Sequence, residues 1–227
     1  MRKILFLLTV FVGIVSVSAQ SSESFKAPTK FTNIAFVNTT MKQSGFPDLK
    51  SNWGVSLTNG HSYYLHKPIN GRLRFGIDVA WIDVNYQNYK VEMLTWEGFQ
   101  EDFTIQEVEL GLQLGAGAHY SFNNRLGVHA SVRYNPCYSM LYRGDDFQGS
   151  FGNFLVAGVS VHYRFIGLGI EGRFGKAKYK SYLDPDNEDD DSDGSGYDAP
   201  AHGAAAGKDG KISSKFAGFR AYVSFAF

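Results

Sequence analysis

The last thirteen residues, KFAGFRAYVSFAF (215–227), constrain the fold most strongly because their polarity alternates with a period of two. From Ala217 onward every odd position is apolar, whereas the even positions mix Gly, Arg, Tyr, Ser and Ala. This period is typical of a β-strand with one apolar face. The stretch exceeds the roughly 9–11 residues that a tilted strand needs to cross a bilayer. We therefore interpret it as the closing strand of a membrane β-barrel.

Earlier parts of the chain show the same alternation, most clearly over 104–121, where Val108 to Tyr120 supply an apolar residue at every even position. The seven further predicted strands are approximately 31–39, 51–66, 72–86, 104–121, 126–140, 151–164 and 168–180. Asn59 and His61 interrupt the apolar face of the second strand, which predicts a bulge or a register change there.

The predicted connections alternate in length, from a long loop at 41–50 to a tight turn at 67–71 and so on along the chain. Outer-membrane barrels have short periplasmic turns and longer extracellular loops. The pattern predicts an all-β fold, an eight-stranded antiparallel transmembrane β-barrel in an up-and-down meander, with both termini periplasmic. An even number of antiparallel strands can close without an unpaired edge in lipid.

The N-terminal residues 1–19 predict a signal peptide: Arg2 and Lys3 precede an apolar run that ends in Val17-Ser18-Ala19. Residues 20–30 are expected to be a short periplasmic lead-in, and 31–227 the barrel domain. After the signal peptide no apolar run reaches the eighteen residues of a membrane-spanning helix. The chain has a single cysteine, Cys137, which excludes an intrachain disulfide.

The formal net charge of zero conceals an acidic segment at 181–212, which we expect to form a long extracellular loop. The equal numbers of acidic and basic residues therefore result from one acidic loop. The basic excess elsewhere does not indicate a nucleic-acid-binding surface. The mean hydropathy of −0.21 suits a barrel, because half of each strand faces a polar interior.

Two barrel types fit the alternation: a membrane barrel with its apolar face outside, and a soluble lipid-binding barrel with that face inside. Aromatic residues favour the membrane barrel because they gather at the predicted strand ends. Tyr120, Tyr163 and Phe227 lie at the turn side, and Trp53 and Tyr134 at the loop side. Such belts suit the two membrane interfaces.

The signal sequence, the eight alternating strands and the terminal AYVSFAF together resemble the small bacterial outer-membrane β-barrel family of the OmpA/OmpX type. The resemblance implies an integral protein of a Gram-negative-type outer membrane. It also implies that the outer-membrane assembly machinery recognises a terminal signal, which would comprise Phe219, Ala221, Val223, Phe225 and Phe227.

The strand faces opposite the apolar ones carry several charged residues, which we expect to point into the barrel. They are Arg72, Arg74, Asp78, Glu107, Glu109, Arg133, Arg164, Glu171, Arg173 and Arg220. Eight strands enclose a space that side chains just fill, so these charges must pair. We interpret them as an interior ion-pair network. The alternative is a narrow gated pore that opens when an Arg–Glu pair breaks.

Other candidate sites have weaker support. Asp189, Asp191 and Asp193 precede Gly194 in a D-x-D-x-D-G pattern that suits a weak calcium site, although a solvated acidic loop explains it too. His119, His129 and His162 are expected to face inward, either as a metal trio or as members of the polar interior. No cofactor is expected beyond this weak Ca²⁺.

The sequence favours a structural or surface-interaction barrel that is not an enzyme. The alternatives are a porin-like narrow gated pore for small solutes or ions and an outer-leaflet lipid-modifying enzyme. Expected partners are the lipid bilayer, the assembly machinery, and an extracellular ligand or lipid head groups at the loops. We expect a monomer and no nucleic acid.

Overall fold

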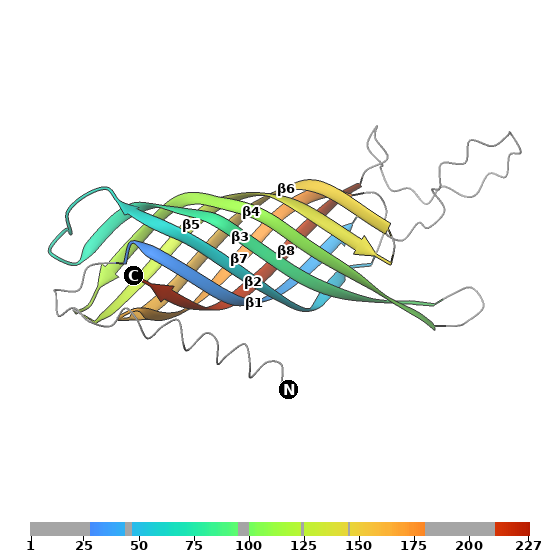
Figure 1. Ribbon diagram of the computed structural model, residues 1–227, viewed down its shortest axis with the longest axis horizontal. Helices are drawn as coiled ribbons and strands as arrows, with labels where there is room; N and C mark the ends of the chain where they lie inside the picture. The colour runs from blue at the N-terminus through green and yellow to red at the C-terminus, as the bar shows by residue number, and fades with distance from the viewer. Residues whose placement is uncertain (1–27, 44–46, 95–99, 124, 145, 180–211) are drawn as a thin grey trace, which may run out of the picture.

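A computed structural model of the chain describes residues 28–43, 47–94, 100–123, 125–144, 146–179 and 212–227. Its eight strands are β1 (Lys30–Gln43), β2 (Leu49–Tyr64), β3 (Leu73–Leu94), β4 (Gln100–Ser121), β5 (Leu126–Arg143), β6 (Asp146–Tyr163), β7 (Ile166–Tyr179) and β8 (Ile212–Ala226). Each strand pairs antiparallel with the next, and β1 pairs with β8, so the sheet is a closed up-and-down barrel (Figure 1). The predicted all-β fold, an eight-stranded antiparallel barrel in an up-and-down meander, is confirmed, and the periplasmic position of the termini stays a prediction.

The two ends of the barrel differ in their connections. We call the end with the connections 65–72, 122–125 and 164–165 the turn end, and the opposite end the loop end. Residues flanking β1 and β8 meet at the turn end, where the amide of Thr29 donates to the carbonyl of Phe227 at 2.8 Å. Figure 1 shows the C-terminus at this end.

Several strands extend further toward the loop end than predicted. The predicted loop 87–103 is wrong over most of its length, because β3 and β4 stay paired as far as Leu94 and Gln100. Likewise β5 and β6 pair through the predicted loop 141–150, as far as Arg143 and Asp146. Backbone pairing in a hairpin needs no apolar face, so the strands continue where the apolar alternation fades.

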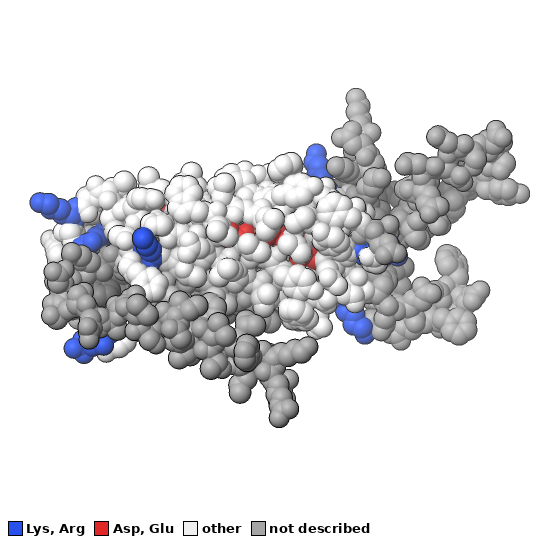
Figure 2. All heavy atoms as spheres, viewed as in Figure 1, with Lys and Arg blue, Asp and Glu red and all other residues white. Residues whose placement is uncertain are grey.

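The outer surface of the barrel is apolar across its middle, and most of its exposed residues belong to the apolar strand faces predicted from the sequence. Leu57, Leu112, Leu114, Val132, Leu155, Ile170, Phe174 and Phe219 are each exposed there. Figure 2 shows blue basic residues at both ends and a white band between them, broken only by a few red atoms. In the described part of the chain, no helix is long and apolar enough to span a membrane.

The barrel interior is layered along its axis. At the loop end it holds an apolar cluster that comprises Met41, Leu49, Tyr89, Val91, Ile105, Cys137, Leu141, Phe154, Ala177, Tyr179 and Phe216. Next to this cluster, toward the turn end, lie buried charged residues from β3, β4, β5, β7 and β8. At the turn end the interior side chains are mainly Ser, His, Asn and Tyr.

A bulge in β3 reverses which residues face inward. Gly60 of β2 pairs with Ala80 and Asn59 with Ile82, so Trp81 is the extra residue. Before the bulge the even positions of β3 point inward, and after it the odd positions do. The irregularity predicted near Asn59 is therefore present, and its extra residue belongs to β3.

Candidate functional site: a buried charge network

The centre of the charge network is Arg220 on β8. Its two terminal nitrogens, Nη1 and Nη2, lie 3.1 Å from Oδ1 and Oδ2 of Asp83 on β3, in a two-pronged ion pair. Both side chains are only 1% exposed. The hydroxyl of Thr58 donates to Asp83 at 2.7 Å, and Glu171 lies 3.5 Å from Arg220. Two strands that are not neighbours in the sheet are thereby joined through the barrel interior.

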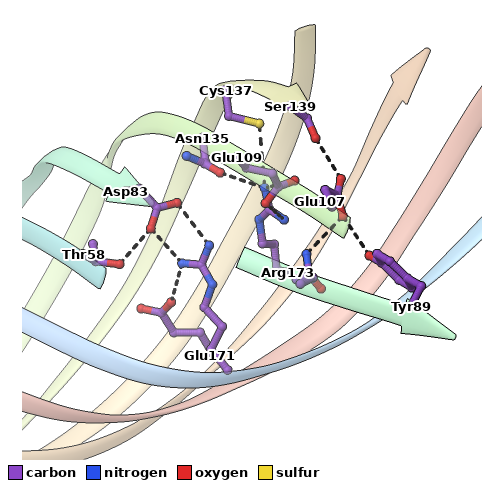
Figure 3. A network of polar contacts seen from close by, with 12 residues as sticks. Thr58, Asp83, Tyr89, Glu107, Glu109, Asn135, Cys137, Ser139, Glu171 and Arg173 are labelled. Carbon is purple, nitrogen blue, oxygen red and sulfur yellow. Dashed lines mark hydrogen bonds and ion pairs between the residues drawn. The ribbon is translucent and has the colours of Figure 1, made fainter. Parts of the chain in front are cut away.

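A second pair lies closer to the loop end. Arg173 on β7 contacts Glu109 on β4, with Nη1 and Oε2 at 2.8 Å and Nη2 donating to Oε1 at 3.0 Å. Its guanidinium lies 3.4 Å from the centre of the Phe154 ring, which gives a cation–π contact. Asn135 accepts a further hydrogen bond from Arg173 at 3.3 Å (Figure 3).

Glu171 connects the central pair to a third arginine, Arg133 on β5. Arg133 Nη2 donates to Glu171 Oε1, while the other oxygen of Glu171 faces Arg220. The guanidinium of Arg133 also lies 5.9 Å from the centre of the Phe31 ring. The chain of charges therefore runs from Asp83 through Arg220 and Glu171 to Arg133.

Glu107 differs from the other acids because only neutral groups donate to it in the described structure. Its carboxylate accepts hydrogen bonds from Tyr89 and Ser139 at 2.8 Å (Figure 3). It also accepts from Gln87 and Tyr179 at 3.3 Å. The side chain is fully buried.

The structure brings together most of the predicted interior residues, but the interior placement of two arginines is wrong. Arg72 and Arg164 are exposed at the turn end. Arg164 has a positive φ of 55°, which marks it as a turn residue rather than a strand residue. Arg74 is half-buried and lies over the Tyr64 ring at 5.5 Å, and no ion pair joins it to a described acid.

Asp78 faces inward as predicted, but its charged partner is a histidine and not an arginine. Its Oδ2 lies 2.7 Å from Nε2 of His129, and its Oδ1 accepts a hydrogen bond from Ser62 at 2.6 Å. Sequence reasoning missed Asp83 altogether, because continuing the even inward phase of the strand places it outside. The interruption at Asn59 was the signal that could have indicated the reversal.

The three inward histidines gather at the turn end without forming a metal centre. The rings of His119 and His129 are 6.2 Å apart, and Nε2 of His162 lies 2.7 Å from the hydroxyl of Ser160. Among the described residues, no group of three His, Cys, Asp or Glu side chains is arranged to hold a metal ion. Asp189, Asp191 and Asp193 lie outside the described residues, as does the predicted signal peptide.

The Ser, His and acid residues at the turn end do not form a hydrolytic triad. In such a triad the histidine lies between the nucleophile and the acid, and takes the proton of the nucleophile. Here Asp78 lies in the middle, with Ser62 on one side and His129 on the other. The carboxylate of Asp78 therefore holds both Ser62 and His129, and His129 is not placed between Ser62 and the acid as a triad requires.

A small polar cavity of about 30 Å³ lies beside these residues, toward the turn end. Its lining includes Tyr64, Asp78, His129, Arg133 and Tyr222. A space of this size has room for a few water molecules at most. At the loop side of the cavity stands the Arg133–Glu171 pair, followed by the other buried charges and then the apolar cluster.

Comparisons with known proteins give structural likenesses only. No protein-family model matches the chain, and no curated protein matches it. Among solved structures, Neisserial surface protein A is 16% identical, with a TM-score of 0.43, over 89% of this chain and 99% of that one. Ail of Yersinia pestis, in complex with a heparin analogue, is 8% identical with a TM-score of 0.37, over 88% and 100%.

The outer membrane protein OprG from Pseudomonas aeruginosa is 12% identical with a TM-score of 0.37, over 90% of this chain and 99% of that one. These scores are all below 0.5. The fold is therefore assigned from the strand pairing of this chain, and its function is inferred from its own residues.

Proposed function

We propose that this chain is an integral outer-membrane β-barrel that is closed to solutes and has a structural or surface-interaction role. The observation that carries the proposal is the reversed polarity of the barrel. Arg133, Arg173 and Arg220 are buried in the interior with their acids, whereas leucines, valines and aromatic residues cover the outside.

This polarity is unfavourable in water. Soluble proteins rarely expose a continuous apolar patch above a few hundred Å². In hydrocarbon the same surface is favourable, and closure of the sheet leaves no strand with an unpaired edge. The soluble lipid-binding alternative requires the opposite arrangement, with the apolar face inside.

The interior supports a closed barrel. Each inward residue of β4 from Ile105 to Glu109 is buried, as is Gln113. The apolar cluster fills the loop half and the ion pairs fill the centre. Because both layers lie across the axis, a solute that entered the cavity at the turn end would meet the charge network and then the apolar cluster.

The experiment is single-channel recording in a planar bilayer, combined with a heat-dependent mobility shift on a detergent gel. We expect a clear mobility shift, which reports a folded barrel, together with no conductance steps above the lipid baseline. Steady conductance from the folded protein would contradict closure. A chain that is soluble without detergent and shows no shift would contradict the membrane location.

The narrow gated pore remains the second candidate because of one observation. The cavity at the turn end is bounded by Arg133, whose contact with Glu171 is the first ion pair beyond it. Separation of this pair would extend the polar space toward Arg220. No arrangement among the described residues favours the lipid-modifying enzyme, so we do not propose it.

A further inference from the structure

Three lysines form a continuous row on the outside of the barrel near the loop end. Lys42 of β1 pairs directly with Lys215 of β8, and Lys215 pairs on its other side with Lys176 of β7. All three side chains are exposed. We call these residues the lysine row. Like charges directly opposite each other on a sheet are destabilising, so the row is unfavourable unless an anion neutralises it.

The lysine row stands at the edge of the apolar surface. One row nearer the middle of the barrel, Phe174 and Ala217 pair with each other on the same face. A groove on this face is lined by the three lysines together with Phe174, Gly175, Phe216 and Ala217. Long lysine stems can cover apolar surface while the ammonium stays in a polar layer.

Acidic partners among the residues that the structure describes offset only part of this charge. Lys42 forms an ion pair with Asp48, and both side chains are about half-exposed. Among the described residues, no carboxylate lies within ion-pair distance of Lys176 or Lys215. Within the described part of the chain, two neighbouring positive charges therefore remain on this face, above an apolar band.

We propose that the lysine row binds the phosphate groups of anionic lipids at the loop-end interface of the membrane. This inference rests on the proposed membrane location. Adjacent strands are about 4.8 Å apart, so the ends of the row are roughly 10 Å apart at the backbone. That span suits one or two headgroup phosphates. Each ammonium supplies three donors to phosphate oxygens, and the groove beside Phe174 accommodates acyl chain.

The test uses the full chain in phosphatidylcholine vesicles, with trace amounts of spin-labelled phosphatidylglycerol or spin-labelled phosphatidylcholine. The fraction of each label immobilised by the protein gives the relative association of the two lipids. A basic residue near an anionic surface contributes about 1 kcal/mol, close to five-fold in association. We therefore expect the native chain to prefer phosphatidylglycerol by about ten-fold or more.

Matched variants locate the preference. The triple variant K42Q/K176Q/K215Q is expected to bind the two labels within about two-fold of each other. K42R/K176R/K215R should keep the preference because it keeps the charge. The control K30Q/K67Q/R72Q removes three charges at the turn end and should also keep it. An undiminished preference in the Gln variant of the lysine row would overturn the proposal.

The outcomes also separate this inference from the proposed function. If neither label is immobilised, the chain is not in the bilayer and both proposals fail. If both labels are immobilised equally by the native chain, only the lipid-phosphate proposal fails. Inorganic phosphate should reduce the preference no more than sodium chloride of equal ionic strength. A selective loss with phosphate would assign the row to free phosphate and overturn the lipid assignment.

Discussion

Arg220 and Asp83 form a two-pronged ion pair across the barrel interior, and they stand 137 positions apart in the sequence. The pair joins the last strand to the third, which are not neighbours in the sheet. Removing one partner of a buried pair leaves an uncompensated charge. Asp83→Asn should therefore lower the free energy of unfolding by on the order of 3 kcal/mol, measured by urea titration in detergent with tryptophan fluorescence.

The control for Asp83→Asn is Asp48→Asn, which breaks the exposed pair with Lys42 and should cost less than about 1 kcal/mol. Adding Arg220→Met to Asp83→Asn should recover most of the loss, because Glu171 keeps Arg133 as a partner. Equal effects of Asp83→Asn and Asp48→Asn would show that the buried pair contributes no more than a surface one.

Replacement by glutamine should destabilise the barrel much more at Glu109 than at Glu107. Glu109 is paired with Arg173, so Glu109→Gln should cost on the order of 3 kcal/mol. Among the described residues only neutral groups donate to Glu107, and the hydroxyls of Tyr89 and Ser139 can turn to accept from an amide. Glu107→Gln should therefore change stability by less than about 1 kcal/mol, or raise it. A loss at Glu107 as large as that at Glu109 would contradict this assignment.

Breaking one ion pair should not open the barrel. Glu171→Ala removes the partner of Arg133, but the apolar cluster that includes Phe154 and Phe216 still fills the loop half. In planar bilayers we expect Glu171→Ala to stay at the lipid baseline, as should Arg164→Ala, whose side chain is outside the network. Conductance steps in Glu171→Ala that are absent in Arg164→Ala would instead support the gated pore.

Two strand glycines provide a test of how closely β4 and β5 approach. A Cβ at Gly115 would lie 2.0 Å from the carbonyl oxygen of Val132, so the backbone itself would have to move. At Gly172 the atom nearest to an added Cβ is Cε2 of the Phe174 ring, at 3.1 Å. This ring can move by the few tenths of an ångström that the Cβ requires. Gly115→Ala should lose at least about 1–3 kcal/mol, as overpacking does, and Gly172→Ala clearly less. Equal melting temperatures would contradict this packing.

The sequence predicted the barrel because polarity with a period of two depends only on which side of the sheet each residue faces. The same reasoning failed where the phase changes. The extra residue Trp81 places Asp83 inside, and a steady alternation cannot anticipate it. The interruption at Asn59 on the neighbouring strand indicated an irregularity, but not which strand carries the extra residue.

The partners inside the barrel were harder to predict than the inward faces. Arg72 and Arg164 were assigned to the interior because the alternation was continued beyond the true ends of β3 and β6. Both residues belong to turns, where their side chains are exposed. The pairing of Arg220 with Asp83, and of Arg173 with Glu109, depends on the tilt of the strands around the barrel. Sequence alternation contains no information on that tilt, so it cannot say which arginine meets which acid.

The most direct test of the account is a nitroxide scan along residues 105–119 of β4 in phospholipid vesicles, with Cys137 replaced by Ser. Collision rates with oxygen, which concentrates in lipid, and with a water-soluble nickel chelate report the surroundings of each position. We expect oxygen accessibility to oscillate with a period of two, with maxima at Leu110, Leu112 and Leu114 and minima at Glu109 and Gln113. Maxima for the nickel chelate at the three leucines, or no oscillation, would contradict a membrane barrel with a buried charged interior.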